Sequence, residues 1–90
     1  MPEVYLKVEW PGNKQDEIYS PSTVITQYFE RGMELTVAQF ELKVSEALGK
    51  ASQRVYERYG YECTSAIGEL NRIKRITSGI NDKNATIKIL

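Results

Sequence analysis

The sequence predicts an α+β fold, in which a β-hairpin and a C-terminal third strand form a small sheet packed by a long αα-hairpin. Apolar and polar residues alternate near both ends of the chain, as they do in strands that bury one face. The segment between them has helical spacing and helix-capping residues. The expected order is β-β-α-α-α-β. A single domain over residues 1–90 is expected, because a chain of 90 residues supports only one small core.

The first two strands are predicted to form a hairpin. Alternate residues are apolar from Val4 to Trp10, and the segment Asp16 to Tyr19 can pair back on them. Between the two segments, Pro11 fixes φ, and Gly12 and Asn13 supply left-handed geometry. This combination is typical of a tight turn.

A short helix is predicted near residues 21–30. Ser20 fits the cap and Pro21 the first helical position, while Gly32 follows the end. Apolar residues one turn apart support it: Val24, Ile25, Tyr28 and Phe29.

A long helix is predicted over 37–59. Thr36 and Gln39 have the spacing of a capping box, Leu35 and Phe40 have the spacing of a hydrophobic staple, and Gly60 stops the helix.

The predicted long helix has three faces. The expected core stripe is Val37, Phe40, Val44, Ala47, Leu48, Ala51, Val55 and Tyr59. A second line consists mostly of small residues: Ala38, Leu42, Ser45, Gly49, Ser52 and Tyr56. The remaining face is polar and includes a Glu46–Lys50 pair.

The line of small residues predicts that another helix packs there. Glycine inside a helix costs roughly 1 kcal/mol relative to alanine, so Gly49 is expected to have a packing role. The sheet should cover one side of the long helix and a helix the other. That helix is either the third helix or part of a second copy of the chain.

A third helix is predicted from about Thr64 to Ser78, antiparallel to the long one because their connection is short. Its apolar arc is Cys63, Ala66, Ile67, Leu70 and Ile73. Its basic residues, Arg72, Lys74 and Arg75, are expected to complement the helix dipole. The third strand runs from Ala85 to Leu90. It lies parallel to the first strand if the short helix only repositions the chain, and antiparallel if that helix spans the domain.

Composition narrows the classes of function. Lys+Arg 12 balances Asp+Glu 12, so no basic field indicates nucleic-acid binding, and neutrality favours self-association. No apolar run is long enough to span a membrane or serve as an export signal, so a cytoplasmic protein is expected. One Cys and no His argue against an internal disulfide and a thiolate–imidazole zinc site.

Few residues are candidates for chemistry. Cys63 precedes a helix whose N–H groups can lower a thiol pKa, but it lies on the apolar arc and no imidazole exists to activate it. The carboxylates are expected to form a solvated face: Glu41, Glu46, Glu57, Glu62 and Glu69. We therefore expect no catalytic, cofactor or metal site. Near the turn between the two long helices, Arg54, Arg58 and Tyr61 are the candidate interaction surface.

Five short motifs resemble those of a small bacterial family, the nitrogen starvation response proteins. They occur in the same order and spacing over roughly residues 1–66: Trp10-Pro11, Ser20-Pro21-Ser22, Tyr28-Phe29, Ala47 to Val55, and Tyr59 to Ala66. Members of that family are encoded beside a nitrilase and other enzymes in a nitrogen-responsive cluster. The resemblance implies an accessory role in assimilating nitrogen, including nitrile nitrogen, and implies no catalytic residue.

The leading hypothesis is a non-enzymatic accessory or regulatory protein that binds a protein partner from the same gene cluster, as a homodimer or in a complex. The alternative is an enzyme subunit or small-molecule-binding protein that uses Cys63, with Arg54 and Tyr61 contacting an anionic ligand.

Overall fold

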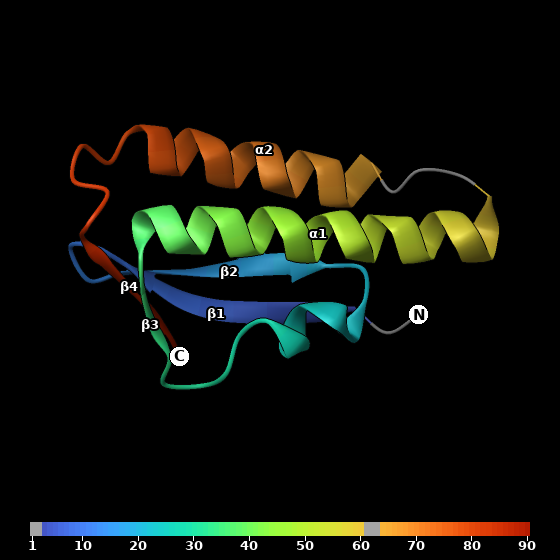
Figure 1. Cartoon of the computed structure of the whole chain (residues 1–90), viewed down its shortest axis with the longest axis horizontal. Helices are drawn as coiled ribbons and strands as arrows, with labels where there is room; N and C mark the ends of the chain where they lie inside the picture. The colour runs from blue at the N-terminus through green and yellow to red at the C-terminus, as the bar shows by residue number, and fades with distance from the viewer. Residues whose placement is uncertain (1–2, 61–63) are drawn as a thin grey trace.

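An antiparallel sheet with two long helices on one face makes up the fold (Figure 1). The computed structural model describes residues 3–60 and 64–90. Within these residues the elements are β1 (Val4–Trp10), β2 (Lys14–Ser20), η1 (Thr23–Gln27), β3 (Glu34–Thr36), α1 (Val37–Tyr59), α2 (Thr64–Ser78) and β4 (Thr86–Ile89). The strand order is β2-β1-β4-β3. The predicted α+β class is confirmed.

The predicted hairpin is present, with Leu6 opposite Ile18 across β1 and β2. The amide of Asn13 donates to the carbonyl of Trp10 at 3.1 Å. Gly12 and Asn13 have φ values of 93° and 65°, so both adopt the left-handed geometry that their residue types favour.

The sheet contains a fourth strand that the sequence pattern did not reveal. β3 has three residues, too few for alternation to be recognised, and Leu35 pairs with Ile87 of β4. β4 itself is antiparallel to β1, with Val8 opposite Ile89, which decides the orientation that the sequence left open.

The prediction of a short helix near residues 21–30 is wrong. A five-residue 3₁₀ turn, η1, occupies Thr23–Gln27, and its cap is Ser22 instead of Ser20. Ser20 is the last residue of β2, and its hydroxyl donates to the carbonyl of Ser22 at 2.7 Å. The apolar spacing correctly predicted buried side chains in this segment, since Val24 and Ile25 are buried. The helical segment is nevertheless shorter than predicted.

Both long helices have the predicted bounds and lie antiparallel, side by side, along the hairpin (Figure 1). The capping box is complete, since the amide of Gln39 donates to Thr36 Oγ1 and the amide of Thr36 donates to Gln39 Oε1, each at 3.1 Å. Gly60 ends α1 with φ 77°. Local capping chemistry therefore determines where α1 begins and ends.

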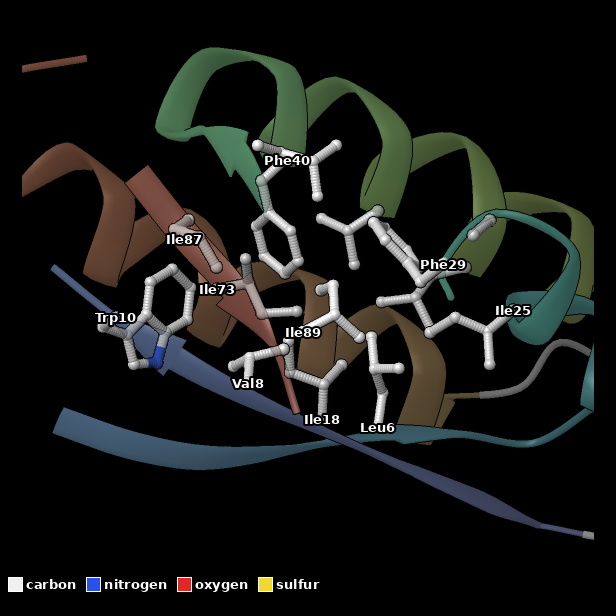
Figure 2. Close-up of a cluster of buried hydrophobic side chains, with 14 of the residues drawn as sticks. Leu6, Val8, Trp10, Ile18, Ile25, Phe29, Phe40, Ile73, Ile87 and Ile89 are labelled. Carbon is white, nitrogen blue, oxygen red and sulfur yellow. The ribbon is translucent and has the colours of Figure 1, made fainter. Parts of the chain in front are cut away.

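The core lies between α1 and the inner face of the sheet. Figure 2 shows Phe40 pointing from α1 toward the strands. Its ring packs edge-on against Trp10, with centroids 5.5 Å apart, and lies tilted against the Phe29 ring, with centroids 5.4 Å apart. Ile18 and Ile89 complete this layer from β2 and β4. On the outer face of the sheet the side chains are exposed or half-buried.

Two residues predicted for the core are instead exposed. Tyr59, the last residue of α1, is 48% exposed because the end of this helix projects beyond the sheet (Figure 1). Ile67, in the first turns of α2, is 44% exposed. The apolar stripes of both helices therefore extend beyond the surface that the sheet covers.

Candidate interaction surface

An apolar surface lies open along α1 and the first half of α2. Three large hydrophobic side chains are exposed there: Leu42 (75%), Tyr56 (53%) and Ile67. Tyr56 and Ile67 border a groove of about 440 Å³ between the helices. Its lining is Leu48, Gly49, Ser52, Gln53, Tyr56, Ala66, Ile67 and Leu70. We call the groove, together with Leu42, the α1–α2 face.

Gly49 lies at the centre of this face without a close neighbour in its own chain. A Cβ built on Gly49 would have no heavy atom within 4 Å. The sequence leaves open whether α2 or a second copy of the chain covers the small-residue line, and at Gly49 the described residues of the same chain do not cover it. α2 packs to one side of the line, which leaves Leu42, Gly49 and Tyr56 at the surface.

Arg54 and Arg58, two of the three predicted interaction residues, do not belong to the α1–α2 face. Arg54 and Arg58 are exposed near the end of α1, and the Arg58 guanidinium lies 5.7 Å from the centroid of the Tyr59 ring. Arg58 follows Gly49 by nine residues, which places it about half a turn away around the helix. Tyr61, the third member of the predicted surface, lies outside the described residues.

The alternative hypothesis, which uses Cys63, is not tested by the structure. Cys63 lies outside the described residues. Among residues 3–60 and 64–90, no group of three or more His, Cys, Asp or Glu side chains is placed to hold a metal ion. The same residues contain no helix that is long and apolar enough to cross a membrane.

A charged cluster connects α2 to β2. Arg72 Nε donates to Glu69 Oε1 at 2.6 Å, and its Nη1 donates to Asp16 Oδ2 at 2.8 Å. Glu69 accepts the amide of Tyr19 at 2.7 Å, and the Trp10 indole donates to Asp16 at 3.0 Å. We call Asp16, Glu69 and Arg72 the anchor cluster.

The anchor cluster changes the expected roles of two residues. The sequence predicts that Arg72 complements the helix dipole, but Arg72 pairs with two carboxylates. The sequence also predicts Glu69 on a solvated face, but the Glu69 side chain is only 12% exposed. The missed signal was Asp16, a charge at an inward position of β2, on the same face of the sheet as Ile18. An inward charge requires a partner, and Arg72 supplies it.

Both carboxyl groups of the cluster have lowered pKa values. Burial acts to raise the pKa of Asp16, but hydrogen bonds from Arg72, Trp10 and the Glu17 amide outweigh it. Burial likewise acts to raise the pKa of Glu69, and the hydrogen bonds from Arg72 and the Tyr19 amide outweigh it. The carboxylates are therefore held ionised, which suits an anchor and does not suit proton transfer near neutral pH.

These features define a small two-layer α+β protein with an anchored hairpin and an exposed apolar face along its two helices. The model of the family described as nitrogen starvation-induced protein NitG matches residues 5–90, and the chain belongs to this family. No curated protein and no solved structure matches the chain. The resemblance drawn from the motifs of residues 1–66 is confirmed, and the family match includes the C-terminal strand.

Proposed function

We propose that this chain is a non-enzymatic accessory or regulatory protein of the nitrogen-starvation response. It acts in the cytoplasm by contact with a protein encoded in the same gene cluster, and the α1–α2 face forms that contact. The exposure of Leu42, Tyr56 and Ile67 around one groove is the observation that carries the proposal.

The chemistry of this face suits a protein better than a small polar metabolite. Its large exposed hydrophobic side chains are one tyrosine and two aliphatic residues, and covering them removes apolar surface from water at about 25 cal/mol per Å². Aromatic residues are enriched in protein interfaces and charged residues are depleted from interface centres. The groove lining likewise contains only apolar and uncharged polar residues.

The test is photocrosslinking inside nitrogen-starved cells. Tyr56 is replaced by p-benzoylphenylalanine, and in a matched control the same replacement is made at Tyr5, which is 56% exposed on the opposite face of the sheet. We expect position 56 to cross-link to a protein that mass spectrometry identifies as a product of the cluster, the chain itself included. The proposal is overturned if position 56 gives no cross-link beyond those that position 5 gives.

A further inference from the structure

We propose that the occupant of the α1–α2 face is a second copy of this chain, with two α1 helices packed antiparallel about a two-fold axis near Gly49. This inference rests on the proposed function, because it names the protein that covers the face. Three independent features of α1 support it: the spacing of its large exposed residues, the open space at its centre, and the order of its charges.

The large residues are placed symmetrically about Gly49. Leu42 precedes it by seven residues and Tyr56 follows it by seven, which is about two turns, or about 10 Å, in either direction. All three therefore lie on one line along the exposed side of α1. In an antiparallel pair centred on Gly49, Leu42 of one copy packs against the partner's Tyr56, and the two-fold axis repeats this contact.

The centre of the line allows two helix backbones to approach. Gly49 has no heavy atom within 4 Å of a built Cβ, and its small neighbours on the line, Ser45 and Ser52, are only half-buried. Glycine at this position costs roughly 1 kcal/mol of helix stability, and packing within one chain provides no compensation. Close contact between two copies, with Gly49 against Gly49, provides it.

Charges beside the line favour the antiparallel orientation. Lys43, Glu46, Lys50 and Glu57 lie on one flank of α1 by their helical spacing. With the axis at Gly49, Lys43 lies within about two residues of the level of the partner's Glu57, and Glu46 within about two residues of the partner's Lys50. A parallel two-fold pair would place this flank of the two helices on opposite sides of the interface, where its charges could not pair. The chain has a net charge of zero, so two copies do not repel one another at long range.

Two glycine variants test the location of the axis. Gly49→Gln puts a side chain where the two helices meet, whereas Gly68→Gln puts the same side chain at an exposed position of α2 outside the groove lining. The added Cβ has no heavy atom within 4 Å at either position, and both positions are exposed, so both variants should fold. We expect sedimentation equilibrium to show dimers for the wild type and for Gly68→Gln, and at least tenfold weaker dimerisation for Gly49→Gln. Equal dimerisation of both variants, or a monomeric wild type, overturns the inference.

A charge swap tests the orientation. Lys43→Glu places two carboxylates near each other across the axis, and Glu57→Lys places two ammonium groups there. Each single variant should weaken dimerisation, by roughly fivefold at low salt, and the double variant should restore it to about the wild-type value. Absence of rescue overturns the antiparallel arrangement.

The cross-linking result separates the two proposals. If the wild type is monomeric but position 56 cross-links to another cluster-encoded protein, the second-copy inference fails and the proposed function stands. If the wild type dimerises but position 56 gives no specific cross-link, the dimer uses another surface and both proposals fail.

Discussion

Arg72→Met should remove the hydrogen bonds and ion pairs that connect α2 to β2 while keeping most of the volume of the side chain. Methionine preserves much of the apolar stem of arginine but none of its donors. In the wild type Arg72 donates to both oxygens of Glu69, to Asp16 and to the carbonyl of Glu17, at 2.6 to 3.1 Å. In the variant, the carboxylates of Asp16 and Glu69, which are both largely shielded from solvent, lose the positive charge that pairs with them.

The expected loss is about 2–3 kcal/mol in the free energy of unfolding at neutral pH. Breaking a fully buried ion pair costs about 3–5 kcal/mol. The Arg72 side chain is 35% exposed, so solvent screens part of the interaction and the estimate falls to about 2–3 kcal/mol. Asp16 also keeps its bonds from Trp10 and the Glu17 amide. The midpoint of urea unfolding should therefore fall by about 1.5–2 M.

Acidification should reduce the difference between Arg72→Met and the wild type. The folded-state pKa values of Asp16 and Glu69 lie below their ordinary values of 3.8 and 4.5. The stability that these groups contribute is therefore fully present above about pH 5 and is lost as pH falls through their lowered pKa values. Without Arg72, the largest of the interactions that lower both pKa values is lost, so both values rise from their wild-type levels and the variant should lose less stability in acid than the wild type.

The assay is urea unfolding followed by circular dichroism, between about pH 7 and pH 2. Arg75→Met is the matched control, because Arg75 is exposed one turn further along α2 and should change stability by less than about 0.5 kcal/mol. The reasoning is refuted if Arg72→Met is no less stable than Arg75→Met at pH 7, or if its deficit is the same at every pH.

Three further changes test the fold itself. Thr36→Ala should lower the free energy of unfolding by about 1 kcal/mol, since it removes the capping box of α1, and thermal unfolding measures the loss. Phe40→Ala should lower it by about 3–5 kcal/mol by opening a cavity beside Trp10 and Phe29; a loss below about 1 kcal/mol would contradict the described core. Gly68→Ala should raise the melting temperature by several degrees, because alanine favours the helix and its Cβ meets nothing; a lower melting temperature would contradict the open space described there.

The parts of the fold that sequence predicted well depend on neighbouring residues. Thr36 and Gln39 are three residues apart, so their reciprocal bonds mark the start of α1 in the sequence itself. Gly60 marks its end in the same way. The hairpin was predictable because its turn requires positive φ at Gly12 and Asn13.

The parts that sequence missed depend on contacts between distant segments. β3 is a strand because β4, some fifty residues later, pairs with it. The anchor cluster joins Asp16 to Arg72 across 56 positions. For the candidate interaction surface, the sequence predicted only one part, the line of small residues around Gly49. It could not show that α2 leaves this line open, because that depends on how the two helices pack.

The anchor cluster also covers part of the exposed edge of the sheet at β2. β2 is an edge strand, and an unpaired edge is a template for adding another chain. Glu69 accepts the outward amide of Tyr19, and Arg72 donates to the outward carbonyl of Glu17, so two side chains of α2 occupy positions that a neighbouring strand would fill. The opposite edge, β3, is only three residues long. Association through strand addition is thus disfavoured at both edges, so the contact that we propose through the α1–α2 face would not compete with extension of the sheet.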